Sequence, residues 1–350
     1  MSRHRSSRVV LGALVLVITL GACRYTGYGD VASATATTKA VSWLKTQQQS
    51  NGGFEVAGFP GFETPDAVQA IANGAQTSAT WNATLARNAV LATVKNGKNP
   101  LDALDDFADG TGANALDAGQ AAKLIVLVAQ PLGLSSTAFD PQGDGAKNLV
   151  ATVDAGLLPN GSYGLFNATL FAAIAKTALN GAPSPATVAY IRGAQQANGG
   201  WSFSGSPSGS DVDVDTTALA IQALVAAHVA PTDPDLVQGL LFLAALHQGH
   251  AAWQSFGSDD PNSTATASLA ISAAGFDVNT SCWRDTVAPI LKGTAYANPL
   301  TWLRSRQAAN GHITSPNDVY PPVNTFATSQ VVQALGRYWL PVAPLAERSC

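Results

Sequence analysis

Two copies of the pattern Gln-x-Asn-Gly-Gly-aromatic constrain the fold of this 350-residue chain more than any other feature. One copy ends at Phe54 and the other at Trp201, and an aliphatic and aromatic stretch precedes each. Weaker copies follow, and the markers of the units are Phe54, Phe107, Tyr163, Trp201, Trp253 and Ile313. Their separations of 53, 56, 38, 52 and 60 residues indicate an array of equivalent supersecondary units.

Each marker is followed by an Ala-rich apolar stretch with a polar residue in front of it. These residues are of the types that cap a helix N-terminus: Thr64, Asp117, Asn167, Asp215, Asn262 and Asn324. Because the stretches are apolar on nearly all sides, we expect them to form buried helices. The helices before the markers carry charges on one side, such as Lys45 and Arg192, and Pro185 and Pro234 suit their first turns. No long run alternates with period two, so no sheet is predicted.

The pattern therefore predicts an all-α chain of six outer–inner helix pairs closed into one ring, a single (α/α)6 toroid. A ring covers both flanks of every inner helix and leaves no end unit to cap. The predicted domain is residues 34–350, preceded by a signal segment at 1–22 and a polar tether at 23–33.

The Gln-x-Asn-Gly-Gly-Trp/Phe signature, with Asp-Val-Asp-Thr-Thr-Ala after one copy, resembles the repeat of the prenyltransferase and squalene-cyclase family. The resemblance covers residues 34–345 and implies an α/α toroid. Triterpene cyclases, protein prenyltransferase β subunits, intrinsic-factor-like cobalamin carriers and complement thioester domains share that fold, so the resemblance fixes the fold better than the activity. The repeat residues Gln49, Gln196, Phe54 and Trp201 are interpreted as structural.

One segment, residues 211–217, could carry chemistry. In triterpene cyclases a similar Asp-x-Asp-Asp-Thr segment holds the aspartic acid that protonates an alkene or epoxide. The resemblance assigns Asp213 to the first acid and Asp215 to the proton donor, but Thr216 replaces the third acid. Asp215 at a helix start is also interpreted as a helix cap, which would keep it ionised. A third possibility is that Asp211, Asp213, Asp215 and Thr216 contact a ligand or a cation.

No cofactor or metal site is expected. The spacing after Asp211 lacks the Gly and the Glu of an EF-hand loop. His228, His247, His250 and His312 are scattered without the spacing of a zinc site and are expected at the surface or in loops. A thioester motif, a nucleophile elbow and a phosphate-binding loop are also missing from the sequence.

The first 23 residues are typical of a bacterial lipoprotein signal. Arg3, Arg5 and Arg8 precede an uncharged run of 12 residues, which is short for a membrane span. The run ends in Leu-Gly-Ala-Cys, so Cys23 is predicted to carry the lipid, and the protein is expected outside the cytoplasm on the membrane surface. In that oxidising setting the other two cysteines, Cys282 and Cys350, are predicted to form a disulfide.

The amino-acid composition limits the classes of function that fit this chain. Only 12% of residues are charged, and the net charge is −4, which argues against a nucleic-acid partner. Aromatic residues make up 7%, few for an enzyme that stabilises carbocations with π faces. The favoured hypothesis is a monomeric, lipid-anchored, non-catalytic protein that binds a small or apolar ligand in its ring. A terpene-cyclase-like enzyme acting through Asp215 and a scaffold for a protein partner are the alternatives.

Overall fold

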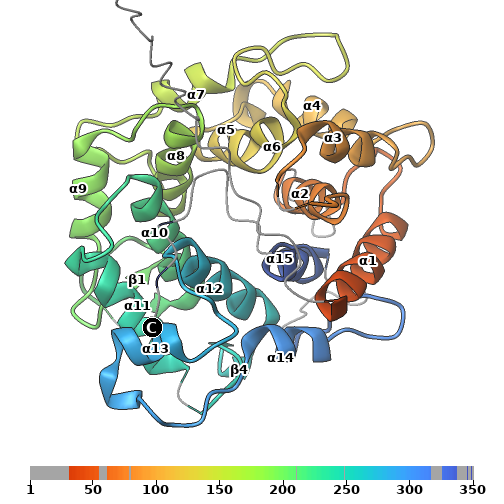
Figure 1. Cartoon of the computed structure of the whole chain (residues 1–350). Coiled ribbons are helices and arrows are strands. Elements are labelled where there is room, and N and C mark those ends of the chain that lie inside the picture. Colours follow the sequence, from red (N-terminus) through yellow and green to blue (C-terminus); the bar gives the residue numbers. More distant parts are fainter. Residues whose placement is uncertain are drawn as a thin grey trace, which may run out of the picture.

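The computed structural model describes residues 31–54, 61–78, 80–209, 211–247, 249–316, 325–336, 345 and 348. Six inner helical segments form a closed ring. In chain order they are α2 (Thr64–Gly74), α5 (Ala118–Leu124), α8 (Phe166–Ala178), α10 (Val214–Ala226), α12 (Pro261–Ala273) and α15 (Thr325–Gly336). From α5 onward each packs against the next, and α15 packs against α2. The helix α2 packs in turn against residues 125–129, which continue α5, and this closes the ring (Figure 1). The predicted toroid of six units is confirmed.

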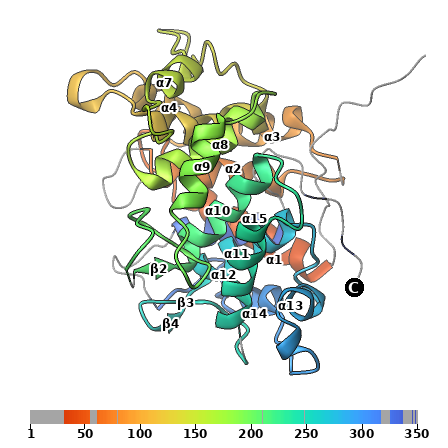
Figure 2. The same ribbon diagram turned by 90° about the vertical axis from the view of Figure 1, so that its left-hand side faces the viewer.

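The outer layer consists of helices that lie behind the inner ones. They are α1 (Val31–Thr46), α3 (Ala83–Leu91), α4 (Pro100–Ala108), α7 (Leu149–Ala155), α9 (Pro185–Gly193), α11 (Pro234–Leu246), α13 (Cys282–Val287) and α14 (Pro299–Ser305). Figure 2 faces α9 and shows the outer layer in front of α8 and α10. Pro185 and Pro234 begin α9 and α11, as predicted. The helix α1 starts at Val31, three residues before the predicted start of the domain at residue 34.

The remaining elements are short. The π-helical segment η2 (Ile125–Ala129) and α6 (Gln130–Leu132) continue α5, while η1 (Gly112–Asn114) and η3 (Pro289–Leu291) are single 3-10 turns. Two antiparallel hairpins precede inner helices: β1 (Trp201–Ser202) pairs with β2 (Val212–Asp213), and β3 (Gln254–Ser255) pairs with β4 (Ser258–Asp259). Among the described residues, no helix has both the length and the apolar character needed to cross a bilayer.

A hydrogen bond that the sequence analysis does not anticipate joins marker and inner helix in five units. The backbone N–H of the marker residue donates to a threonine hydroxyl of the inner helix at 2.9–3.1 Å. The pairs are Phe54–Thr64, Tyr163–Thr169, Trp201–Thr217, Trp253–Thr264 and Ile313–Thr328. Phe107 has no such role, because it lies within α4.

The glutamine that joins the outer helices is one residue earlier than expected. The Gln195 side chain donates to the carbonyl of Gly199 in its own turn and to that of Asp235 in α11, both at 2.8 Å. Gln307 binds Gly311 and, at 2.8 Å, Ala36 of α1, which ties the last unit to the first. Gly199 has φ +89°, and a Cβ there would overlap the carbonyl of Gln238 in α11, so glycine is required at this close approach.

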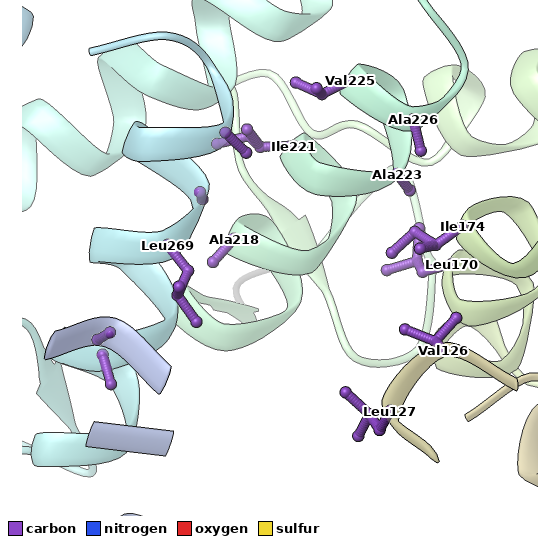
Figure 3. Packing of buried hydrophobic residues seen from close by; sticks show 14 of the residues in the cluster. Val126, Leu127, Leu170, Ile174, Ala218, Ile221, Ala223, Val225, Ala226 and Leu269 are labelled. Carbon is purple, nitrogen blue, oxygen red and sulfur yellow. The ribbon is translucent and has the colours of Figure 1, made fainter. Parts of the chain in front are cut away.

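Apolar side chains fill the space between the inner helices. Leu170 and Ile174 of α8 lie beside Ala223 of α10, and Leu269 of α12 lies beside Ala218 (Figure 3). All of these residues are buried, and the small alanines allow the inner helices to approach closely.

Candidate functional site

The N-terminus of α10 is organised by Asp213 rather than Asp215. The Asp213 side chain accepts a hydrogen bond from the Thr216 backbone N–H at 2.6 Å, and its extended backbone is that of an N-cap residue. The pairing of Asp213 with Trp201 in the β1–β2 hairpin places it there. The interpretation of Asp215 as the helix cap is therefore wrong, because the hairpin delivers the chain to the helix two residues earlier.

Asp215 lies in the first turn of α10, and its carboxylate is directed toward α12. It accepts hydrogen bonds from Thr266 Oγ1 at 2.8 Å and from Ser263 Oγ at 3.1 Å. The side chain keeps accessible surface, yet the surrounding protein excludes enough water that desolvation raises the pKa of Asp215 to about 6. The Thr266 hydroxyl partly opposes this shift, and the charges of Asp213 and Asp260 add to it.

The other predicted residues of this segment do not join Asp215. The Asp211 carboxylate accepts hydrogen bonds from Ser204 Oγ at 3.1 Å and from Gln196 Nε2 at 3.4 Å within the exposed loop of the hairpin. Thr216 is buried, and its backbone N–H is used by the cap. Among the described residues, Asp211, Asp213 and Asp215 form no cluster of metal-ligating atoms.

Accessible side chains recur at equivalent places on four inner helices. They come in pairs four residues apart near the helix N-termini: Asn167 and Phe171 on α8, Asp215 and Leu219 on α10, Asn262 and Thr266 on α12, and Phe326 and Gln330 on α15. Residues with this spacing lie on one face of a helix. Neighbouring inner helices cover the flanks and outer helices cover the back, so this face is directed to the centre of the ring. We call this set the inner row.

Lys123 of α5 extends the inner row across the ring. Its ammonium forms an ion pair with Asp66 of α2 at 2.8 Å. It also lies 4.9 Å from the ring centroid of Phe62 and 5.8 Å from that of Phe326 on α15. Phe62 and Phe326 stack on each other at 5.0 Å. Because α2 stands between α5 and α15 in the ring, these contacts meet on the inner side.

Several residues of this site are not found from sequence. Lys123 lies in an apolar stretch that predicts a buried helix. A single charged residue in such a stretch is the sequence signal that could have marked Lys123 as a site residue. Ser263 and Thr266 fit an ordinary helix start, so only the structure reveals their bonds to Asp215.

His247 lies in a turn, as expected of a loop histidine, but it is not a surface residue. It follows α11, has no exposed surface, and is surrounded by Trp253, Trp283 and Tyr296, with ring centroids 4.7–5.8 Å away. Burial, and to a smaller extent the charge of Arg284, lowers the pKa of His247 to about 4. The sequence spacing of these rings is irregular, so no local pattern predicts the cage.

Cys282 at the start of α13 is disulfide-bonded. Its two possible partners, Cys23 and Cys350, lie outside the described residues, and the pairing with Cys350 stays a prediction. The lipidation predicted at Cys23 also lies outside them. The described residues of the C-terminal tail fit the predicted pairing, since Leu345 and Arg348 donate backbone hydrogen bonds to Ala273 and Gly275, shortly before Cys282.

Comparison with known proteins places this architecture in the class of terpene-cyclase-like α/α toroids. The type II terpene cyclase MstE from Scytonema, in complex with its substrate geranylgeranyl dihydroxybenzoate, superposes with a TM-score of 0.62 at 15% identity, covering 88% of this chain and 97% of that one. The same enzyme in complex with its product, merosterolic acid A, gives 0.60 at 16% identity, covering 87% and 96%. No protein-family model and no curated protein sequence matches the chain.

Proposed function

We propose that the protein binds a small, largely apolar molecule inside its ring, against the inner row, and does not transform it. The observation that carries this proposal is the set of accessible side chains at the centre of an otherwise closed helical ring. Ligand sites are typically concave, mostly apolar and supplied with a few polar groups that fix orientation. The inner row has this composition.

The side chains of the inner row favour a ligand with an apolar body and a polar end. Phe171, Leu219 and Phe326 offer apolar contact, while Asp215 accepts hydrogen bonds from a hydroxyl. MstE is in complex with a molecule of this kind, geranylgeranyl dihydroxybenzoate. This likeness supports the isoprenoids as the first ligand class to test.

Acid catalysis through Asp215 is a second candidate, and one observation favours it. Asp215 is free of the capping role, and its pKa of about 6 means that a fraction is protonated near neutral pH. Lys123 argues against it, because its ammonium lies over Phe62 and Phe326. These two π faces are already engaged by a cation, so they are not open to stabilise a carbocation. Binding without turnover is therefore the better account.

The binding proposal is tested by fluorescence titration with 8-anilinonaphthalene-1-sulfonate, competed by geranylgeranyl dihydroxybenzoate. Leu219→Trp fills the inner row and should weaken the affinity for both probes by about tenfold or more, a loss of about 1.4 kcal/mol. Leu246→Trp, at the exposed end of α11, is the matched control and should bind like the parent protein. Equal affinities of the two variants for the probes would show that the inner row is not the binding site.

Turnover is tested separately with squalene and geranylgeranyl dihydroxybenzoate, with cyclised products analysed by mass spectrometry. Binding without products is the expected result for the parent protein and for Asp215→Asn. Products from the parent protein that disappear in Asp215→Asn would establish the catalytic alternative.

We further propose that the protein is exported and anchored by lipid on Cys23, as the sequence of residues 1–23 indicates. Cys23→Ser should then move the protein from the membrane fraction to the medium. Unchanged membrane association of this variant would contradict the lipid anchor without affecting the binding proposal.

A further inference from the structure

Three carboxylates lie close together between α4 and the loop 139–147. Figure 1 shows α4 in the outer layer of the toroid. Asp105 comes from α4, and Asp140 and Asp144 come from the loop. One carboxylate oxygen from each residue lies within 4.8 Å of the other two. Such a separation lets one cation contact all three groups.

Asp105 is the unusual member of this cluster, because its side chain has no exposed surface. Its Oδ2 accepts a hydrogen bond from the Gln142 backbone N–H at 2.7 Å, whereas Oδ1 is buried and has no hydrogen-bond partner. A buried carboxylate oxygen without a partner is costly in a folded protein. One oxygen of this carboxylate lies within 4.8 Å of an oxygen of Asp140 and one of Asp144, so the buried Asp105 carboxylate belongs to the acidic cluster.

The lysines nearby do not neutralise the three acids. Lys147 pairs with Asp109 at 3.5 Å, and Lys98 donates to the side-chain oxygen of Gln142 at 2.9 Å. Among the ion pairs between described residues, none involves Asp105, Asp140 or Asp144. The carboxylates of the cluster are therefore not compensated by a basic side chain of the described residues.

The loop itself has the spacing of a calcium-binding segment. Asp140, Gln142, Asp144 and Gly145 occupy positions 1, 3, 5 and 6 of the pattern D-x-[DN]-x-[DN]-G, with Gln in place of Asn. Asp140 Oδ1 accepts backbone N–H bonds from Gly143, Asp144 and Gly145 at 2.8–3.3 Å, which leaves Oδ2 for another contact.

Position 12 of this loop, which is Glu in an EF-hand, is Ala151 here. Asp105 supplies a carboxylate from a different element instead. No metal is predicted from sequence because Asp105 lies 35 residues before Asp140, outside any local ligand pattern.

We propose that Asp105, Asp140 and Asp144 bind a calcium ion that fastens the loop 139–147 to α4. Hard oxygen donors from carboxylates suit Ca²⁺, and a loop that can adjust suits its flexible coordination better than the strict octahedron of Mg²⁺. The cation would compensate the buried charge of the Asp105 carboxylate, whose Oδ1 has no hydrogen-bond partner. This site lies on the outside of the toroid and is independent of ligand binding at the inner row.

Thermal unfolding of the purified protein in EDTA and in CaCl2 tests the proposal. Affinities of extracellular calcium modules are about 10⁻⁴–10⁻³ M, so about 10 mM CaCl2 should raise the Tm by a few degrees. Asp105→Asn should have a higher Tm than the parent protein in EDTA, because it removes the buried charge, and should not respond to calcium. A purely structural role of Asp105 would give a lower Tm instead.

Two further variants complete the design. Asp144→Asn, at an exposed loop position, should keep the Tm in EDTA and lose the response to calcium. Asp259→Asn, on β4 away from the cluster, is the charge-matched control and should respond like the parent protein. Calorimetric titration with CaCl2 should give one site per chain. No calcium response in the parent protein, or equal responses in the parent protein and Asp105→Asn, would overturn the proposal.

Discussion

Asp213 and Asp215 stand two residues apart, yet the first turn of α10 gives them different environments. Asp213 satisfies the helix end, whereas Asp215 is bound by two hydroxyls of α12 and is accessible from the centre of the ring. Residue type alone could not separate them, since both are good capping residues. The difference arises from the β1–β2 hairpin, which fixes where the helix begins.

The raised pKa of Asp215 predicts a pH effect on stability. Because the folded state binds the proton more tightly than the unfolded state, ionisation between pH 3.8 and about 6 should lower the free energy of unfolding. Relative to Asp215→Asn, the parent protein should lose stability as pH rises through this window and then level off. Urea unfolding of both proteins from pH 4 to 7.5 measures the difference.

Thr266→Val provides an internal check on that experiment. It removes a hydroxyl that favours the ionised carboxylate, so the loss of stability should extend to higher pH. A stability difference between the parent protein and Asp215→Asn that is independent of pH would contradict the assigned environment.

The titration of His247 should change the stability of the fold with pH in the opposite direction to that of Asp215. Its folded-state pKa of about 4 lies below the ordinary 6.5, so the unfolded state binds the proton more tightly and stability should fall as pH drops from 6.5 to 4. At about 1.4 kcal/mol per factor of ten in proton affinity, the loss approaches about 3 kcal/mol. His247→Phe keeps an aromatic ring in the cage and should abolish this loss in acid unfolding experiments. The same acid sensitivity in both proteins would rule out His247 as its source.

At the scale of elements, the repeated motif works through backbone groups. The aromatic marker packs in the core, its N–H donates to a threonine of the inner helix, and the glutamine of the preceding turn binds the next outer helix. The sequence predicts the helix pairs and the tight turn, because the glycines and the apolar periodicity are local signals. It does not predict which glutamine or threonine makes the contacts, since several stand side by side.

Thr217→Val tests the bond between marker and inner helix. The substitution keeps the shape but leaves the Trp201 backbone N–H buried without its acceptor, at a cost of about 1–3 kcal/mol. The free energy of chemical unfolding should fall by that amount. Thr280→Val, in an exposed turn, is the control and should change stability by less than about 0.5 kcal/mol. Equal effects would mean that this bond is dispensable.

At the scale of the whole molecule, closure of the ring depends on contacts between the first and last units. Gln307 binds the Ala36 carbonyl, and the guanidinium of Arg304 donates to Ser33 Oγ at 2.9 Å. The closed ring could be predicted from the repeat number, because an inner helix without a neighbour would expose an apolar flank. The inner row could not, since it is assembled from units far apart in sequence, and the acidic cluster could not, since no local pattern joins Asp105 to the loop 139–147.

The C-terminal tail carries a prediction at the same scale. If Cys350 is the partner of Cys282, the bond closes a long loop and contributes about 3–4.5 kcal/mol in the chain-entropy account. Thiol titration of the denatured, unreduced protein after removal of the signal and lipidation of Cys23 should find no free cysteine. Two reactive thiols per chain would contradict the pairing.

Native mass spectrometry of the protein purified from its own host tests the central claim, that the ring interior holds a small molecule, most directly. One bound molecule per chain is expected on the parent protein and on Leu246→Trp, and none on Leu219→Trp. After addition of geranylgeranyl dihydroxybenzoate, the parent protein and Leu246→Trp should again bind one molecule per chain, and Leu219→Trp none. Identical spectra for all three proteins, free of any bound molecule in both conditions, would contradict the claim.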